Sequence, residues 1–374
     1  MRLKRRGMGM DFGLIGLARS GKTTVFDVLT SGHVPTGTYE TGGPHVGVVK
    51  LPDPRLDELV AHFKPKKSTH ADVRYLDFPG AAFAKGFGRE GASAEVLTAL
   101  ARTDALIHVV RVFRSERVPH PEGTVDPHRD VATMDLELAF ADLAFVQKRL
   151  ERLDIAVRSA KAGERAAGEK EVALLERIKA GLEAETPLRA QTLSPDEWRL
   201  LHDYNFLTAK PMLLLLNIDE ADVSRADELE AEFRRRWAGP HRDVAALCAK
   251  IELELGELSE EEAVEFRADL GVLEIGRDLV IRRSFELLGL ISFFTVNPED
   301  GHAWVVPRGT TALTAAGKVH SDMERGFIRA EVLGWRELLD SGSLAEARKQ
   351  GVLRLEGKQY EVQDGDVLHI LFSV

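Results

Sequence analysis

Short apolar runs, separated by helical or loop-like stretches, recur through the N-terminal and central parts of the chain. They have the length of buried strands, and strands that alternate with helices are typical of a largely parallel sheet covered on both faces. The clearest runs lie at residues 11–17, 73–78, 105–112, 211–217 and 243–248. The pattern therefore predicts an α/β domain with a mostly parallel sheet.

A different pattern interrupts this series between the third and fourth runs. Apolar residues there follow an alternating three-and-four spacing, first at Leu136, Ala139, Leu143, Val146, Leu150, Leu153, Val157 and Ala160, then at Val172, Leu175, Ile178 and Leu182. This spacing is typical of a coiled coil, and the small, charged, glycine-containing segment 161–168 favours a turn. We therefore predict an antiparallel helical hairpin. The alternative is a pair of ordinary surface helices packed on the sheet.

The pattern changes again from about residue 291, where shorter strand candidates alternate with glycine-containing turns. These candidates lie at 292–295, 303–306, 352–355, 360–362 and 368–372, with one helix at 311–318. The C-terminal part is therefore predicted to be a small, separate α+β domain. The acidic segment 252–265 before it is expected to form a solvated helix and not a metal site.

The composition bounds the class of protein. Among 374 residues, 60 acidic and 50 basic side chains give a formal net charge of -10, which argues against coating of nucleic acid by bulk charge. The single cysteine, Cys248, excludes an intramolecular disulfide and suits a reducing compartment. No run approaches the roughly 20 apolar residues of a membrane-spanning helix. We expect a cytoplasmic protein of two or three domains, with neither a membrane nor a specific DNA sequence as partner.

The most specific motif is Gly16-Leu-Ala-Arg-Ser-Gly-Lys22-Thr23, which matches the phosphate-binding pattern G-x-x-x-x-G-K-[ST]. It directly follows the first predicted strand and precedes a helical run. The glycines let backbone N–H groups face a phosphate, and the dipole of the following helix adds to the attraction. We expect Lys22 to span the β- and γ-phosphates and Thr23 to bind Mg²⁺.

A second segment of this site, Asp77-Phe-Pro-Gly80-Ala81, ends the next strong strand. Asp77 is placed to hold Mg²⁺ through a water, and the Gly80 N–H to contact the γ-phosphate. In the Ras-like hydrolases a glutamine follows the glycine and positions the attacking water, whereas this chain has Ala81. Alanine cannot orient water by hydrogen bonding, so a nucleotide-dependent binding module is an alternative to an enzyme.

The segment Asn217-Ile218-Asp-Glu220 lies where guanine-specific P-loop proteins carry Asn-Lys-x-Asp. Glu220 is one methylene longer than aspartate, and Ile218 keeps the apolar cover but lacks the charge of lysine. Asn217 can donate and accept together, which suits the N6/N7 edge of adenine. These substitutions favour ATP over GTP.

The segment Cys248-Ala249-Lys250 follows the last of the five strand candidates. We expect its backbone to touch the nucleotide base, as a Ser-Ala-Lys loop does in related P-loop proteins. Cys248 is either a redox-sensitive thiol or a small apolar filler, and the sequence leaves both interpretations open.

Together these motifs resemble the YchF family of Obg-related P-loop proteins. The other segments that carry the resemblance are 46–49, 51–56, 108–111, 125–127, 251–255, 303–304, 308–311, 315–317, 325–332, 355–358 and 362–367. The C-terminal end resembles the family's TGS domain, a ubiquitin-like β-grasp module. The resemblance implies a nucleotide-binding domain in two parts, 9–128 and 206–290, with an inserted helical hairpin at 129–205 and a TGS domain at 291–374.

The resemblance also implies slow, Mg²⁺-dependent hydrolysis of ATP in preference to GTP, and association with the ribosome through the helical and TGS domains. Thr41 aligns with the family's magnesium-binding switch threonine, and Ile218 with the residue that lies against adenine. The family lacks the switch glutamine, and the loop histidine proposed to act instead corresponds to His120. The phosphate-binding segment of the family aligns with Arg19, Ser20, Gly21, Lys22, Thr23 and Thr24.

The chain departs from the family pattern in the interior of the P-loop, in the Asp77 segment and in both switch segments, where Thr38 competes with Thr41 for the metal. Three hypotheses follow. The first is an ATPase switch that reports its nucleotide state to a ribosomal partner. The second is a binding module that hardly hydrolyses, and the third is a conventional GTPase in which Glu220 replaces the usual aspartate.

Overall fold

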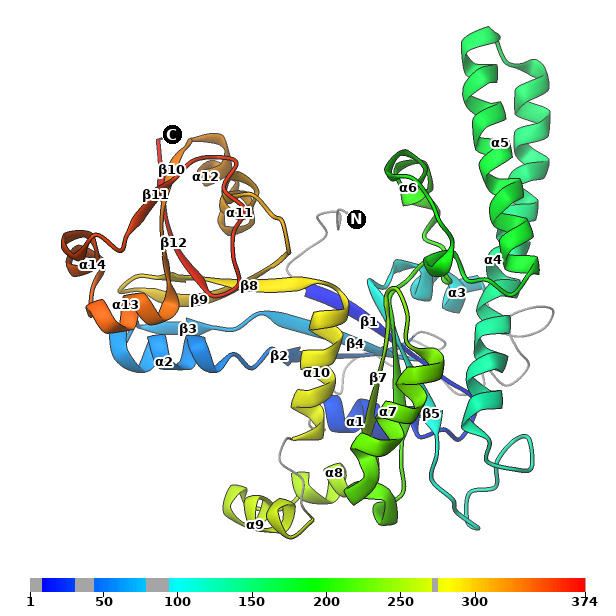
Figure 1. Cartoon of the computed structure of the whole chain (residues 1–374), viewed down its shortest axis with the longest axis horizontal. Helices are drawn as coiled ribbons and strands as arrows, with labels where there is room; N and C mark the ends of the chain where they lie inside the picture. Colours follow the sequence, from blue (N-terminus) through cyan, green and yellow to red (C-terminus); the bar gives the residue numbers. More distant parts are fainter. Residues whose placement is uncertain (1–8, 31–43, 79–93, 271–274, 374) are drawn as a thin grey trace. The chain divides into compact units, whose positions relative to one another are not determined.

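The computed structural model describes residues 9–30, 44–78, 94–270 and 275–373 (Figure 1). The chain divides into two compact units, one built from Met10–Val48 and Arg74–Leu287 and the other from Val49–Val73 and Leu288–Val374. The second unit therefore takes in a segment, Val49–Val73, that the sequence had grouped with the first part of the nucleotide-binding domain.

The first unit is built on a sheet whose six described strands follow the order β2-β4-β1-β5-β6-β7. The predicted parallel arrangement is confirmed for the pairs β1–β5, β5–β6 and β6–β7. All five predicted strands are present, and β2 was not expected. The strands are β1 (Gly9–Ile15), β2 (His45–Lys50), β4 (Asp72–Asp77), β5 (Ala105–Arg111), β6 (Met212–Asn217) and β7 (Arg242–Leu247).

The central strands β5 and β6 are buried along their whole length because helices cover the sheet. Leu214 and Leu216 of β6 pack in the same apolar cluster as residues of α3, α4 and α7, while α10 contacts β6 and β7. The helices of this unit outside the hairpin are α1 (Lys22–Thr30), α3 (Ala94–Arg102), α6 (Pro195–Leu201), α7 (Ala226–Trp237), α8 (Ala249–Gly256), α9 (Glu260–Leu270) and α10 (Gly276–Leu287), with short 3-10 turns η2 (Leu188–Ala190), η3 (His202–Tyr204) and η4 (Glu220–Arg225). The acidic segment 252–265 thus belongs to two helices, α8 and α9, instead of one.

The predicted hairpin consists of α4 (Pro127–Ser159) and α5 (Ala162–Glu183). Its two helices pack through the expected apolar positions, among them Val146, Leu153 and Ile178. The predicted loop at 161–168 is wrong, because α5 already begins at Ala162. Gly168 belongs to the helix packing: a Cβ built there would lie 2.5 Å from Val157 Cγ2 on the facing helix.

The second unit contains a sheet with the order β11-β10-β12-β8-β9-β3. Strands β8–β9 and β10–β12 pair antiparallel, whereas β12–β8 and β3–β9 pair parallel. One apolar cluster joins this sheet to α11, and another joins it to α2. The elements are α2 (Pro54–Phe63), β3 (Lys67–Thr69), β8 (Leu290–Val296), β9 (Asp300–Pro307), α11 (Ala312–Val319), α12 (Ser321–Arg325), β10 (Phe327–Gly334), α13 (Trp335–Ser341), α14 (Leu344–Gln350), β11 (Arg354–Glu356) and β12 (Asp366–Phe372).

The sequence prediction for this unit was incomplete. The candidate strand at 360–362 is wrong, since Glu361 makes only an isolated bridge to Thr311. Strand β10 was missed because Arg329 and Glu331 interrupt its apolar pattern. Glu331 is nevertheless 5% exposed, and it is bonded to Arg348 and to His369.

Candidate nucleotide-binding site

The P-loop connects β1 to α1, and close packing fixes both of its glycines. Gly16 has φ 149°, and a Cβ at this position would lie 2.5 Å from the carbonyl oxygen of Val109. Gly21 has φ 92°, and its Cβ would lie 2.3 Å from Asn217 Nδ2. Any side chain at either position would displace the neighbouring strand or the base-binding segment. The expected phosphate-binding loop is therefore formed as a tightly packed turn.

Lys22, at the start of α1, folds back over this loop. Its Nζ donates to the carbonyl oxygens of Gly16 at 2.8 Å and Leu17 at 2.9 Å. Burial lowers the pKa of Lys22 to about 8, although the charge of Asp77 opposes this shift. A phosphate group would favour the charged form, so the lysine is matched to an anionic ligand.

Thr23 and Asp77 come together at the carboxyl end of β4. The Thr23 hydroxyl donates to Asp77 Oδ2 at 3.1 Å, and burial raises the pKa of this carboxyl group despite that hydrogen bond. Asp77 Oδ1 and the Ser20 hydroxyl are buried without a hydrogen-bond partner among the described residues. The Asp77 carboxylate and the Thr23 hydroxyl supply the hard oxygen ligands that Mg²⁺ prefers, and water and phosphate oxygens would complete its coordination shell. These residues therefore fit the metal that a P-loop requires.

Of the other residues predicted to bind phosphate or metal, one lies among the described residues and the rest lie outside them. Thr24 lies half-buried in the first turn of α1. Thr41, Gly80 and Ala81 lie outside the described residues. The phosphate site thus consists, in the described chain, of the P-loop, the start of α1 and the end of β4.

Asn217, at the end of β6, links the P-loop to the base-binding segment. Its Nδ2 donates to the Ser20 carbonyl oxygen at 3.1 Å, and its Oδ1 accepts from the Ala249 N–H at 3.2 Å. This bond occupies one of the two lone pairs of the oxygen, so the other stays available to the N6 amino group of adenine, the role expected from the sequence. One amide N–H is left for purine N7, which adenine and guanine share. Asn217 therefore holds the P-loop and the Ala249 segment together.

Burial also bears on two more residues of the expected base site. Ile218 is 2% exposed and Cys248 is 6% exposed, and both pack in the apolar cluster of the sheet. In the described conformation Ile218 therefore packs in the core of the sheet. Burial raises the pKa of the Cys248 thiol, which favours the filler interpretation over a redox-sensitive thiolate.

Glu220 and Lys250 lie at the rim of the site and form an ion pair with each other. Their side chains are 44% and 66% exposed, and the hydrogen bond to Glu220 raises the pKa of Lys250. Solvent screens such an exposed pair, so it contributes little to stability and can open when a ligand competes.

His120 lies in the segment between β5 and α4, and its side chain is only 2% exposed. Its Nε2 is 2.8 Å from Asp130 Oδ2, and its Nδ1 accepts from the Glu122 N–H at 3.1 Å. Arg129 holds the other oxygen of the same carboxylate at 2.8 Å. Both ring nitrogens are therefore engaged in the described conformation, and His120 is tied to the first turn of α4.

Comparisons with known proteins agree with this fold. The ribosome-binding ATPase YchF of Bacillus subtilis is 38% identical over 372 residues, which is 98% of this chain and 100% of that protein. The chain belongs to the YchF family. The ribosome-binding ATPase YchF of Escherichia coli O157:H7 is 36% identical over 370 residues, again 98% of this chain and 100% of the relative.

Two further comparisons concern the fold of this YchF-family chain. The YchF-GTPase_C model, described as "Protein of unknown function (DUF933)", matches residues 290–373. The solved structure of the Schizosaccharomyces pombe YchF GTPase has a TM-score of 0.82 and 29% sequence identity, and covers 98% of this chain and 99% of that one. The predicted combination of a P-loop domain and a C-terminal TGS domain is thereby confirmed.

Sequence reasoning missed one buried residue next to the P-loop of this YchF-family chain, Arg111. It ends β5, is 2% exposed, and donates to the carbonyl oxygens of Val118 at 2.6 Å, Phe113 at 3.2 Å and Arg19 at 3.4 Å. Its guanidinium also lies 4.3 Å from the centre of the Phe113 ring. Arg111 therefore joins the P-loop to the His120 segment. An arginine at the end of a mostly apolar strand was the signal that could have identified it.

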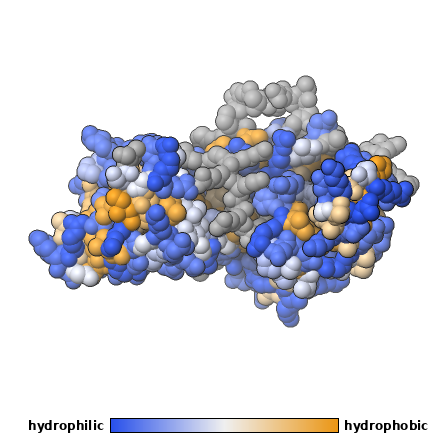
Figure 2. All heavy atoms as spheres, turned by 90° about the horizontal axis from the view of Figure 1, so that it is seen from above, coloured by the Kyte–Doolittle hydropathy of each residue, from blue (hydrophilic) through white to orange (hydrophobic). Residues whose placement is uncertain are grey.

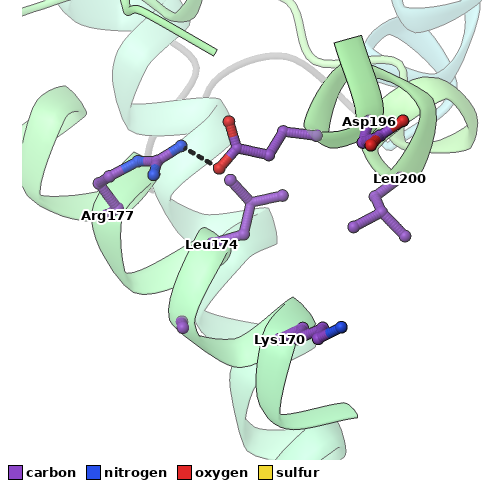
Figure 3. A pocket seen from close by; sticks show the side chains of 7 residues that line it. Lys170, Leu174, Arg177, Asp196 and Leu200 are labelled. Atoms are coloured by element: carbon purple, nitrogen blue, oxygen red, sulfur yellow. Dashed lines mark hydrogen bonds and ion pairs between the residues drawn. The ribbon is translucent and has the colours of Figure 1, made fainter. Parts of the chain in front are cut away.

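Two surface features lie outside the phosphate site. A hollow of about 330 Å³ separates α5 from α6, where Leu174 and Leu200 line it beside the ion pair of Arg177 with Glu197 (Figure 3). On the face shown in Figure 2, apolar residues also gather on the second unit, whose exposed apolar side chains include Ile328, Leu355 and Phe372. Among the described helices, none is long and apolar enough to cross a membrane.

Proposed function

We propose that this chain is a Mg²⁺-dependent P-loop switch of the cytoplasm that binds and slowly hydrolyses ATP in preference to GTP and associates with the ribosome. The observation that carries the proposal is the convergence of Lys22, Thr23 and Asp77 on one P-loop. Lys22 supplies positive charge to the terminal phosphates, and Thr23 with Asp77 would hold Mg²⁺. The bound metal would offset charge on the phosphate oxygens during phosphoryl transfer.

The preference for ATP rests on the residues that replace the guanine-reading motif. A guanine-specific site needs a short carboxylate opposite the base, and here Glu220 is longer and is paired with Lys250. The cost of opening that exposed pair is small, so the length of the side chain carries most of the argument. The curated relatives are named ATPases, whereas the Schizosaccharomyces pombe structure is titled a GTPase.

Side-by-side titration with the two nucleotides tests this preference. We expect ATP to bind more tightly than GTP, and Glu220→Asp to shift the ratio of affinities toward GTP by about tenfold, which corresponds to about 1.4 kcal/mol. Glu228→Asp, on the exposed start of α7, is the matched control. A clear preference of the unmodified chain for GTP would overturn the adenine assignment.

Slow hydrolysis is supported by the environment of His120. The ring is held by Asp130 and Glu122, so it must leave one of these partners before it can position water. This rearrangement adds to the barrier, and Ala81 offers no substitute. The same observation favours the second hypothesis, a binding module with little hydrolysis. Single-turnover hydrolysis with excess protein, with and without ribosomes, separates the two hypotheses: absence of turnover in both conditions favours the module.

Ribosome association is supported by the names of the relatives and by the charge of the hairpin tip. Residues 155–170 contain four basic and two acidic side chains, in a chain whose net charge is -10. The basic side chains Arg158, Lys161, Arg165 and Lys170 are all exposed. A positive tip on an extended hairpin suits the phosphates of ribosomal RNA, and such contacts weaken as salt rises.

Cosedimentation with ribosomes at several salt concentrations tests this contact. We expect Arg165→Glu at the tip to reduce cosedimentation at least several-fold at moderate salt. Arg235→Glu makes the same charge change on an exposed position of α7 and should leave it unchanged. Equal loss in the two variants would assign the effect to net charge and contradict a role for the tip.

A further inference from the structure

The P-loop contains a non-glycine residue in the left-handed backbone region. Arg19 has φ 63°, and its carbonyl oxygen accepts from Arg111 Nη1 at 3.4 Å. A side chain in this region costs roughly 1–2 kcal/mol, so a glycine would be easier to accommodate here. Strained residues of this kind concentrate at functional sites, where the strain is offset by what the side chain does.

The guanidinium of Arg19 extends toward the His120 segment. Its Nη1 donates to the carbonyl oxygen of Pro119 at 3.1 Å, in a solvent-exposed hydrogen bond. A hydrogen bond to a neutral carbonyl contributes only about 1 kcal/mol to stability, and one to an ionised phosphate is roughly twice as strong. The segment does not depend on this contact, because Arg111 holds Val118 and Asp130 holds His120. The guanidinium is therefore free to exchange Pro119 for a phosphate.

We infer that Arg19 is a catalytic residue of the proposed ATP hydrolysis, whose guanidinium binds the terminal phosphate oxygens in the transition state. In that step the water oxygen forms a bond to the γ-phosphorus, and the bond from phosphorus to the β–γ bridging oxygen breaks. The electron pair of that bond goes to the β-phosphate, and the proton of the water ends on the released phosphate. Arg19 gains and loses no proton; it stabilises the negative charge that develops on the oxygens.

This role for Arg19 would supply charge stabilisation to a site that lacks the water-orienting glutamine. The loop has a second cation, Lys22, which lies where the loop meets α1, whereas Arg19 lies in the exposed turn of the loop. The chain has alanine in place of the glutamine that orients water in Ras-like hydrolases. A second cation on the phosphate lowers the barrier by stabilising the charge of the transition state, as an arginine supplied in cis does in other P-loop enzymes.

The backbone geometry dictates the test variant. Arg19→Gly removes the guanidinium and adopts φ 63° without strain, so the loop keeps its shape. Arg19→Lys keeps a charge but loses the forked donors. The matched control is Arg117→Ala, which removes an exposed arginine from the segment between β5 and α4. For each variant we would measure ATP affinity by equilibrium binding and the single-turnover rate of hydrolysis with excess protein.

We expect Arg19→Gly to hydrolyse ATP at least tenfold more slowly while its ATP affinity changes by less than threefold. Arg19→Lys should be intermediate, and Arg117→Ala should match the unmodified chain. Added guanidinium ion at millimolar concentration should restore part of the rate to Arg19→Gly alone. An Arg19→Gly rate within twofold of the unmodified chain, or a loss of affinity with no loss of rate, would overturn the assignment. If the unmodified chain binds ATP without any turnover, the proposed hydrolysis fails as well, which is a distinct result.

Discussion

His120 Nε2 lies 2.8 Å from Asp130 Oδ2, and both side chains are almost completely buried. Because Nδ1 accepts from the Glu122 N–H, the proton of the neutral ring is on Nε2, which donates to the carboxylate. The residue expected to position water is thus also the residue that fastens its own segment to α4, the first helix of the hairpin. Any change that moves α4 would act on the proposed catalytic histidine.

Removal of this histidine separates the structural role from the catalytic one. His120→Ala leaves the buried carboxylate of Asp130 without its ring partner, and we expect a loss of about 1–3 kcal/mol in the free energy of unfolding, measured with denaturant. If His120 also acts in hydrolysis, the single-turnover rate should fall at least tenfold. His62→Ala, at an exposed position of α2, is the control for both measurements. Lower stability with an unchanged rate would show that His120 has only the structural role.

The buried ammonium of Lys22 predicts how ATP affinity depends on pH. Its pKa is lowered by burial to about 8 in the free protein, and a bound phosphate raises it again. Below pH 8 the group is already charged and the affinity should vary little. Above pH 8 a proton must be taken up on binding, so the affinity should fall by up to about tenfold per pH unit.

Binding measurements between pH 7 and pH 9.5 check this slope. Lys22→Gln should bind weakly and lose the alkaline dependence, whereas Lys66→Gln, which removes a lysine with a 74% exposed side chain, should keep it. A flat profile up to pH 9.5 in the unmodified chain would contradict the assigned charge state of Lys22.

The charged side chain of Asp77 is expected to lower the stability of the nucleotide-free protein and to support metal binding. Burial raises the pKa of its carboxyl group in the folded protein. Because this pKa is higher in the folded protein than in the unfolded chain, the group adds to the free energy of unfolding at pH values below the unfolded pKa. That contribution is lost as the pH rises through the folded pKa. The ionised carboxylate therefore opposes folding at neutral pH. Asp77→Asn should therefore raise the Tm of the nucleotide-free protein at pH 7 and remove the dependence of ATP affinity on Mg²⁺. Asp57→Asn, at a 63% exposed side chain, is the control, and wild-type Mg²⁺ dependence in Asp77→Asn would contradict the metal role.

The sequence was informative wherever one local pattern determines the structure. Gly16, Lys22 and Thr23 lie at the predicted junction of a strand and a helix, because the phosphate-binding motif has a fixed spacing and a fixed strand-to-helix context. The base site was harder. Asn217 and Ile218 owe their orientation to the P-loop, to Ala249 and to the core, which are contacts over long separations that no spacing reveals.

The second unit shows the same limit in its topology. Residues of α2 pack against β8 and β9, although more than two hundred positions separate them along the chain. Local periodicity identified β8, β9, β11 and β12 of this unit but missed β3 and β10, and it could not assign Val49–Val73 to the unit. Charged residues such as Glu331 obscured β10, because a carboxylate held by Arg348 and His369 can be buried where an isolated one cannot.

Two glycines of α5 allow the misassigned turn to be tested directly. Gly163 and Gly168 were both interpreted as turn residues, and both lie inside the helix. A Cβ at Gly163 would meet no atom within 4 Å, so Gly163→Ala should stabilise the protein by about 0.5–1 kcal/mol through helix propensity.

At Gly168 the same methyl group would lie 2.5 Å from Val157 Cγ2 and force the two helices apart. We expect Gly168→Ala to be at least about 1 kcal/mol less stable than Gly163→Ala in denaturant unfolding, since packing strain cancels or exceeds the gain in propensity. Val157→Ala removes the clashing methyl group and should largely rescue Gly168→Ala, and equal stabilisation by the two alanines would mean that the helices do not approach as closely as described.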